Sequence, residues 1–452
     1  MNERSVHLKR ELGLYDLTLL LVIAVVNINT IPLIAQEGWR SMSFWMIAFC
    51  LFLIPTASSV AEFGKRYPGE GGIYRWTHEM FGDFHAFLAG WCYWTNNLFY
   101  FPSVLFILVG VIVYTGGAGS AGLGDNTYVV AAGSLAFLWF ITLLHVRGLG
   151  VGKWLNNIGA VGTRFGILVL ITIGIVILNR KGASATPYQA SALLPSFGDY
   201  QSFSALSLTM YSLVGLELGS VMGDEIRNTR KIIGRAALLA GAISILLYLL
   251  GTGSLLLAVP AAEIGATQGL MQAVTFVSQD LRFTVLIPGV AVLFSLAVLG
   301  VCSAWISGAA RIPFVMGLDV YLPPVLGNTH KKWGTPHVAL LVQATVSSLF
   351  ILISLYGSFV REAYEFLLKS SVVLQLIPFL YLFLGLWKLG RKRLIGLLGT
   401  LGTAFGIAFV FIPSSEIDNT LRFELQLISS CGLMLGLAVL FFLIGKRKHV
   451  AT

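Results

Sequence analysis

Long apolar segments recur along the whole chain and constrain its fold more than any other feature. Each is long enough to cross the hydrocarbon core of a bilayer, about 30 Å thick, as a helix. Twelve such segments cover residues 14–36, 42–64, 83–114, 127–145, 152–179, 201–222, 232–258, 284–318, 336–355, 363–388, 393–413 and 421–445. Because lipid offers no partner to exposed backbone groups, the chain is expected to fold as an all-α membrane protein with twelve transmembrane helices.

The composition agrees with a chain embedded in lipid. Hydrophobic residues make up 56% of the sequence and charged residues 11%, whereas ordinary soluble domains carry about 25% charged residues. A cytosolic enzyme, a disulfide-stapled secreted domain and a disordered chain are therefore excluded. The sequence shows no phosphate-binding loop, dinucleotide fingerprint or Ser-His-Asp arrangement in a suitable setting, so we predict no enzymatic activity and no cofactor.

The cysteines also argue against a redox or metal centre. Cys50, Cys92, Cys302 and Cys431 all lie inside apolar runs. None belongs to a C-x-x-C pair, and no histidine is placed to complete a zinc site. We predict that all four are buried packing residues and that the protein holds no metal.

The net charge of +9 is distributed unevenly. With the N-terminus in the cytoplasm, twenty-two of the thirty Lys and Arg residues fall on the cytoplasmic side and six on the opposite side. The positive-inside rule then predicts a multi-pass protein of the cell membrane, inner or plasma, with both termini cytoplasmic. The basic excess is thus a topology signal, and nucleic-acid binding is excluded. No connection is long enough for a second domain, so residues 1–452 are expected to form one transmembrane unit.

Polar and helix-breaking residues interrupt the first span near the bilayer centre. Asn27, Ile28, Asn29 and Thr30 precede Pro32, which lacks a backbone N–H and clashes with the preceding turn. Such residues are costly in lipid and are functional candidates by default. We expect the helix to unwind here; the alternative is a kinked helix whose Asn side chains bond to neighbours.

A second interruption is expected in the sixth span. Tyr211, Ser212, Gly215 and Glu217 lie at its centre. Two broken helices in corresponding positions, five spans apart, are what an inverted-repeat transporter requires, because their half-helix ends form one site at the repeat interface. We therefore predict a substrate site between these two spans.

Three stretches resemble motifs of the amino acid-polyamine-organocation (APC) permeases. They are residues 67–94, 211–236 and 294–340, which contain YPGEGG with FGDF, GLELGSVMGDEIRNTRKIIGR, and SGAARIPFVMGLDVYLPP with GTP. The resemblance implies the LeuT-type fold: inverted repeats over residues 1–180 and 200–390, and two appended helices with the C-terminal tail over 391–452. It also implies transport by alternating access, with the substrate between helices 1 and 6.

The first interruption departs from that family's usual Gly-Ser-Gly-Ile-Phe, which aligns with residues 27–31. Glycines let backbone N–H groups approach a substrate carboxylate, whereas Asn27 and Asn29 crowd that approach and add amide donors and acceptors. We expect a small amine-bearing substrate, because backbone carbonyls freed by the break, together with Glu217, could bind its ammonium group.

The third and tenth spans supply further candidates for substrate binding. Tyr93, Asn96, Asn97 and Tyr100 recur at helical spacing and predict a polar stripe directed at the centre of the bundle. Gln375 lies deep in the tenth span and is expected to line the pathway.

Coupling residues are predicted from the fifth and eighth spans. Many proton-coupled relatives carry a Lys one residue before the position of Arg164, so Arg164 is interpreted as a fixed charge that replaces a coupling cation; a structural arginine is the alternative. Ser303 and Ser307 share one face near the first break, where related folds hold sodium, although serines in membrane helices often bond only their own backbone. Glu365 and Lys369 have the spacing of an ion pair that stabilises the bundle or closes a gate.

Together these features predict a secondary transporter for amino acids or related amines, coupled to protons or working as an exchanger. Its partners are the small-molecule substrate, protons and the bilayer. A polyamine carrier is the alternative within transport. A membrane nutrient sensor that keeps the fold without transporting is the alternative from another class.

Overall fold

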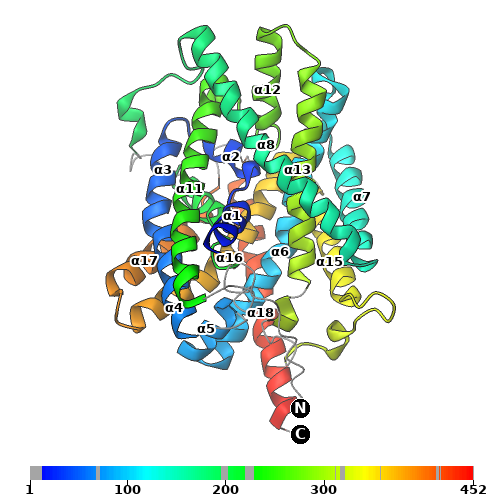
Figure 1. Ribbon diagram of the computed structural model, residues 1–452. Helices are drawn as coiled ribbons and strands as arrows, with labels where there is room; N and C mark the ends of the chain where they lie inside the picture. The colour runs from blue at the N-terminus through cyan, green and yellow to red at the C-terminus, as the bar shows by residue number, and fades with distance from the viewer. Residues whose placement is uncertain are drawn as a thin grey trace.

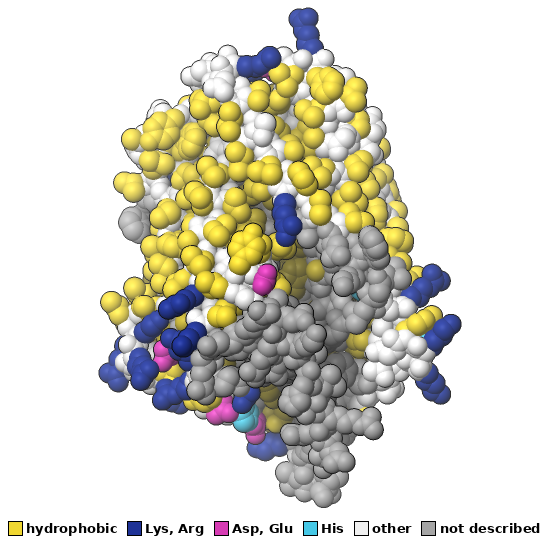
Figure 2. Space-filling model, in the orientation of Figure 1, with side chains coloured by type: hydrophobic (Ala, Val, Ile, Leu, Met, Phe, Trp, Pro, Cys, Tyr) yellow, Lys and Arg dark blue, Asp and Glu magenta, His cyan; other side chains and the backbone are white. Residues whose placement is uncertain are grey.

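The computed structural model describes residues 13–67, 72–194, 202–218, 229–310, 312–315, 321–356, 358–413, 417 and 419–450. Among these residues, eleven helices are long and apolar enough to cross a membrane. They pack side by side into one bundle (Figure 1), and apolar side chains cover a broad band of its surface, with Lys and Arg gathered toward the lower end in the view of Figure 2. The protein is therefore a multi-pass membrane protein.

The first half of the chain forms α1 (Leu14–Val25), η1 (Ile28–Thr30), α2 (Ile31–Ala35), α3 (Arg40–Ala48), the π-helical turn η2 (Phe49–Leu53), α4 (Ile54–Arg66), α5 (Gly72–Phe81), α6 (Asp83–Ile112), η3 (Val113–Gly116), η4 (Ala118–Asp125), α7 (Thr127–Val146), α8 (Leu149–Lys181) and η5 (Ala190–Leu193). The second half forms α9 (Phe203–Ser212), α11 (Thr229–Ala258), η8 (Ala261–Glu263), α12 (Gly269–Asp280), α13 (Leu286–Ala309), α14 (Ile312–Val315), η10 (Pro324–Gly327), α15 (His337–Leu355), α16 (Val360–Lys388), α17 (Arg393–Val410) and α18 (Thr420–Val450).

Local sequence explains where several of these helices begin and end. The side chain of Asn126 accepts hydrogen bonds from the backbone N–H groups of Tyr128 and Val129, at 3.0 and 3.2 Å, and so caps the start of α7. Gly182 adopts the left-handed conformation (φ 63°) and ends α8. Capping residues outside the apolar runs therefore set where these two membrane helices begin or end.

The sixth predicted span, over 201–222, is interrupted where the sequence predicts: its described part consists of the ten-residue α9 and a turn through Glu217, and residues 219–228 lie outside the described residues. The eighth, expected over 284–318 as one tilted helix, ends at Ala309, and α14 follows. Pro313 explains this end, since proline lacks the backbone N–H that a continuous helix would donate to the carbonyl of Ala309.

Two helices outside the twelve predicted segments complete the described fold. In Figure 1, α5 lies at the lower end of the bundle beside α4, and α12 lies at the upper end near α13. Both are short and amphipathic and pack against the spanning helices: α5 against α6, and α12 against α13 and α8. The search for long apolar segments could not find them, because neither crosses the membrane.

Direct backbone contact brings α8 and α13 together. A Cβ atom placed on Gly159 would lie 2.2 Å from the Cα atom of Gly300, and the reverse holds equally. At Gly162 a Cβ atom would lie 2.7 Å from the backbone nitrogen of Ala297. Small residues at such crossings permit close packing of membrane helices. Of the predicted packing cysteines, Cys92, Cys302 and Cys431 are buried, but Cys50 is exposed on the surface of the bundle, which corrects the prediction for that residue.

Candidate functional site

The first break lies between α1 and η1. Val26 and Asn27 adopt extended backbone conformations, with ψ near 104° in both. The side-chain oxygen of Asn27 then accepts a hydrogen bond from the backbone N–H of Asn29 at 3.1 Å and starts the next helical turn. Pro32 lies in the first turn of α2, where its missing N–H costs nothing. The interruption thus falls within the predicted stretch, and Asn27 is both its breaker and its cap.

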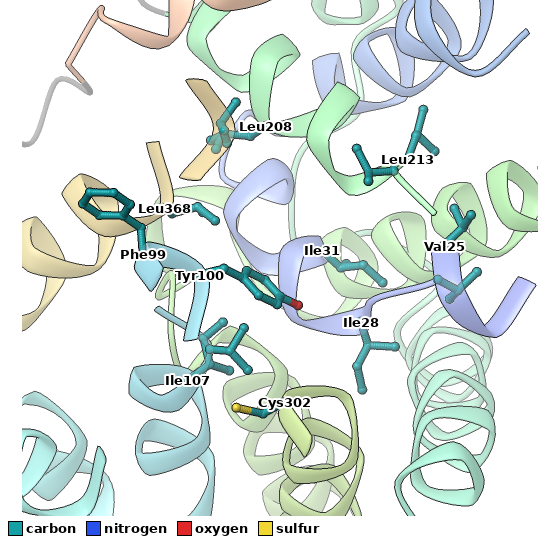
Figure 3. Close-up of a cluster of buried hydrophobic side chains, with 14 of the residues drawn as sticks. Val25, Ile28, Ile31, Phe99, Tyr100, Ile107, Leu208, Leu213, Cys302 and Leu368 are labelled. Carbon is teal, nitrogen blue, oxygen red and sulfur yellow. The ribbon is translucent and has the colours of Figure 1, made fainter. Parts of the chain in front are cut away.

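Asn27 also reaches across to α6. Its side-chain nitrogen donates a hydrogen bond to the hydroxyl of Tyr100 at 3.0 Å. Figure 3 shows Tyr100 pointing from α6 toward the segment that carries Ile28 and Ile31. The side chain of Asn27 therefore fixes the first break to the third spanning helix.

The second break follows α9. Residues Leu213 to Glu217 form a turn, and Gly215 has φ 135°, a conformation that other residues rarely adopt. A Cβ atom at this position would lie 2.9 Å from the carbonyl carbon and oxygen of Ala24 in α1. Glycine is thus required both by the backbone conformation and by the close crossing of the two broken segments.

The carboxylate of Glu217 closes this second turn. One of its oxygens accepts a hydrogen bond from the backbone N–H of Gly215 at 2.9 Å, and the other accepts one from the hydroxyl of Tyr93 at 3.0 Å. The side chain is buried. Glu217 therefore stabilises the second break and ties it to α6.

Tyr248 on α11 joins the two breaks, and the sequence analysis did not identify it. Its hydroxyl lies 2.7 Å from the carbonyl oxygen of Val25 and 2.8 Å from that of Ser212, and it accepts a hydrogen bond from the backbone N–H of Asn27 at 2.9 Å. The ring stacks on Trp45 of α3 with ring centroids 4.1 Å apart. One hydroxyl thus serves the last carbonyls of both half-helices, α1 and α9, which have no partner within their own helices.

A cavity of about 510 Å³ lies beside the crossing of the breaks. Nine of the predicted site residues line it: Asn27, Thr30, Tyr93, Asn96, Asn97, Tyr100, Tyr211, Ser212 and Gln375. The cavity has the size and the mixture of apolar walls and few polar groups that are typical of small-molecule sites. The structure therefore gathers, around one space, residues that the sequence places on four separate spans.

The cavity extends toward the end of the bundle at which α1 begins. Its walls on that side are residues of α1 before the break, of α8 near its start and of α13 near its end, among them Ile23, Thr163 and Ala304. On the opposite side, Tyr211 bonds to Ser371 at 2.8 Å between the two hydroxyl oxygens, and the Tyr100 ring packs edge-on against Tyr211. These contacts join α9 to α16 and to α6 on that side of the cavity.

A family model for amino acid permeases matches residues 12–436. The chain belongs to this family. It lies within the APC superfamily whose motifs the sequence resembles. Relatives of this permease are transporters, not enzymes.

Three relatives show how broad the family is. An uncharacterized transporter of Legionella pneumophila is 27% identical over 98% of both chains. A probable agmatine/putrescine antiporter of Lactococcus lactis is 25% identical, with 76% of this chain and 72% of the relative covered. A branched-chain amino acid permease of Bacillus subtilis is 25% identical over 76% of this chain and 74% of its own. These names span cationic amines and apolar amino acids, so similarity alone does not select a substrate.

The other predicted binding residues of the permease lie around the cavity without lining it. Ile28 and Asn29 are buried within η1. Gly215 and Glu217 lie behind the cavity wall in the second turn. Trp305 of α13, which the sequence analysis missed, does line the cavity and packs edge-on against Tyr100 at 6.1 Å between ring centroids. An isolated tryptophan in an apolar span carries no local signal of such a role.

None of the three predicted coupling residues lines the cavity. Arg164 is exposed on α8, where the nearby Val161, Phe165 and Leu168 are exposed as well. The hydroxyl of Ser303 lies 2.8 Å from a ring nitrogen of the buried His145 on α7. Ser307 is buried on α13, one turn further along. The coupling role assigned to these residues stays a prediction.

The predicted pairing of Glu365 and Lys369 is confirmed. The ammonium nitrogen of Lys369 lies 2.7 Å from a carboxylate oxygen of Glu365, and the two side chains are 1% and 8% exposed. The same nitrogen donates to the carbonyl oxygen of Ile412 at 2.6 Å and lies over the ring of Phe423. The pair thus links α16 to the end of α17 and the start of α18.

Proposed function

We propose that this permease is a secondary active transporter that carries amino acids or related amines by alternating access. The carrying observation is the cavity of about 510 Å³ lined by residues of both breaks. Broken helices at mid-membrane mark the substrate sites of transporters that are built from inverted repeats. The family and its transporter relatives supply the general activity.

The proposal includes the LeuT-type arrangement, with helices 1 to 5 over residues 1–180 and helices 6 to 10 over 200–390 as inverted repeats. Helices 11 and 12 follow over 391–452. In support, the breaks after Val25 and Ser212 fall in the first helix of each proposed repeat and lie against one another at Gly215. The sixth of the twelve helices would consist of α9 and the chain that follows it.

The proposed orientation places both termini in the cytoplasm of a cell whose inner or plasma membrane holds the protein. The cavity then faces the cytoplasm, because α1 begins at that side. The contacts of Tyr211 with Ser371 and of Asn27 with Tyr100 would have to separate for the cavity to face the outside. Coupling to protons or exchange of one substrate for another would drive the cycle, and relatives named as antiporters support exchange.

Uptake into liposomes that contain the purified protein tests the proposal. We expect saturable uptake of one or more amino acids or amines, and its loss in Ala304→Trp, because the indole would fill the cavity. Leu349→Trp is the matched control, since Leu349 is exposed on α15. Substrate binding without uptake would indicate a non-transporting sensor instead. The proposal would be overturned if monodisperse protein showed no binding and no uptake.

A second set of liposomes separates the modes of coupling. Uptake that follows an imposed pH gradient in vesicles without internal substrate indicates proton coupling. Uptake that requires internal substrate indicates exchange.

A further inference from the structure

The cavity carries polar side chains on its largely apolar walls, but no ionised group is among the described residues that line it. Its polar side chains are amides, hydroxyls and phenols: Asn27, Asn96, Asn97, Gln375, Thr30, Thr163, Ser212, Tyr93, Tyr100 and Tyr211. The acidic group next to it, Glu217, gives its oxygens to Tyr93 and Gly215. Glu365 and Lys369 bond to each other between α16 and its neighbours. A substrate with an extra charge therefore meets no counter-charge on the described walls.

Two of the four cavity amides are already committed to protein partners. Asn27 donates to Tyr100 and accepts from the backbone of Asn29. Asn96 donates to the carbonyl oxygen of Tyr93 at 2.6 Å and accepts from Ser371 at 3.4 Å. These two side chains hold helices together and have little capacity left for a solute.

The other two amides keep hydrogen-bonding capacity. Gln375 is 2% exposed, and within the described part of the chain neither its side-chain oxygen nor its nitrogen has a partner. Asn97 donates to the carbonyl oxygens of Tyr93 and Trp94, at 3.0 and 3.2 Å, while its side-chain oxygen lacks a described partner. Buried polar groups without partners are destabilising, so their presence on a cavity wall points to a ligand that completes them.

We propose that Gln375 and Asn97 form hydrogen bonds with a neutral polar group of the substrate, and that the permease selects net-neutral polar amino acids over diamines and acidic amino acids. This inference rests on the proposed transport function and names its substrate class. A primary carboxamide fits best. Its NH₂ group can donate to the oxygens of Gln375 and Asn97, and its carbonyl can accept from the nitrogen of Gln375.

Charge decides against the alternatives. Moving a second ammonium group or an extra carboxylate out of water is costly unless a partner of opposite charge receives it. The described cavity offers none, although one relative is named as an agmatine/putrescine antiporter. A zwitterion with a neutral side chain brings no such extra charge, and its polar tip meets the amides.

The test compares four solutes of similar length in proteoliposomes: glutamine, glutamate, norleucine and putrescine. For the native protein we expect glutamine uptake to exceed each of the others by at least about tenfold, because a site built for hydrogen bonds rejects analogues that lack them. In Gln375→Leu the preference for glutamine over norleucine should fall by about tenfold. Gln375→Glu keeps the shape and adds a carboxylate, so it should raise putrescine uptake relative to glutamine.

Gln426→Leu provides the matched control, since Gln426 is half-buried on α18 away from this cavity, and its preferences should equal those of the native protein. Size-exclusion profiles establish that each variant is folded. Native uptake of amino acids or putrescine without a preference for glutamine, or a preference that survives Gln375→Leu, would overturn the inference and leave the proposed function standing. Absence of uptake and binding for every amino acid and amine would overturn the proposed function itself.

Discussion

The two breaks meet the same requirement by different chemistry. At the first, the amide side chain of Asn27 caps the next turn and bonds to Tyr100, so a side chain does the work that bare glycines leave to the backbone. At the second, Gly215 supplies the backbone conformation and Glu217 supplies the acceptor. The conformation of the first break therefore depends on side-chain hydrogen bonds, whereas that of the second depends on the absence of a side chain at Gly215.

The difference shows which break can vary. The two segments cross where Gly215 touches the backbone at Ala24, and this crossing tolerates no added atom. Asn27 instead lines the cavity, where a change of side chain alters the space offered to a solute. Tyr248 holds both breaks in either case. We infer that the second break fixes the architecture and the first adjusts recognition.

Gly215→Ala should have the largest effect. The added methyl would lie 2.9 Å from backbone atoms of α1 at a φ of 135°, and strain and overpacking each cost roughly 1–3 kcal/mol. We expect a large loss of folded protein and of uptake, measured by thermal melting and by yield. Gly289→Ala is the control, because the new methyl on α13 would have no described atom within 4 Å apart from its chain neighbours and the adjacent backbone of its own helix. A normal melting temperature for Gly215→Ala would contradict the fixed crossing.

Tyr248→Phe should come next. The ring and its stacking on Trp45 remain, but the backbone groups of Val25, Asn27 and Ser212 lose their shared partner. Each unpaired buried group costs roughly 1–3 kcal/mol. We expect folded protein with uptake reduced more than about tenfold. Tyr128→Phe, at an 85% exposed tyrosine on α7, should leave uptake unchanged. Equal uptake in both variants would show that the hydroxyl of Tyr248 does not hold the breaks.

Glu217→Gln should have a smaller effect and should leave the fold intact. The amide oxygen can still accept from Gly215, while its NH₂ group faces the hydroxyl of Tyr93, which must then rotate to accept. A carboxyl group changes charge with pH and an amide does not. We therefore expect lower uptake with a weaker dependence on pH, measured between pH 5 and 8. Glu263→Gln, in the exposed turn η8, is the control. An unchanged pH profile would remove Glu217 from the mechanism.

Much of the architecture could be predicted because membrane helices carry their signal locally. Long apolar runs define the spans, and Asn27, Pro32 and Gly215 interrupt them through their own backbone preferences. The polar stripe on the third span was predictable for the same reason, and Tyr93 and Asn97 line the cavity. Features that depend on the residues of a single helix can thus be predicted from the sequence.

Features that depend on neighbouring helices were not. Tyr248 and Trp305 look like ordinary aromatic residues of apolar spans, and only the packing of α11 and α13 brings them to the breaks and the cavity. Ser303 was predicted near the first break, but its hydroxyl meets His145. Arg164 was interpreted as a fixed charge that replaces a coupling cation because proton-coupled relatives carry a Lys one residue earlier, yet a shift of one residue along a helix is a rotation of about 100°, enough to turn a side chain to the exposed face. The sequence does not display that rotation.

The smallest change in overall rate is expected for Asn27→Gly combined with Asn29→Gly, which gives the first break the glycines that related permeases usually carry. Asn27 would lose its bonds to Tyr100 and to the backbone of Asn29, whereas within the described residues the Asn29 side chain has no bonds to lose. We therefore expect Asn27→Gly alone to produce nearly the whole effect, with the first break destabilised by roughly 1–3 kcal/mol per lost bond.

The informative readout is the order of substrates. If Asn27 narrows the site, the double variant should accept larger α-amino acids more readily relative to the native substrate, because the two glycines leave more space beside the first break. Asn126→Gly removes a helix cap outside the cavity and controls for loss of stability alone. A panel of substrates, normalised to folded protein, decides the matter. A proportional loss for every substrate would mean that Asn27 only stabilises the break, and the contrast between an adjustable first break and a fixed second break would then be wrong.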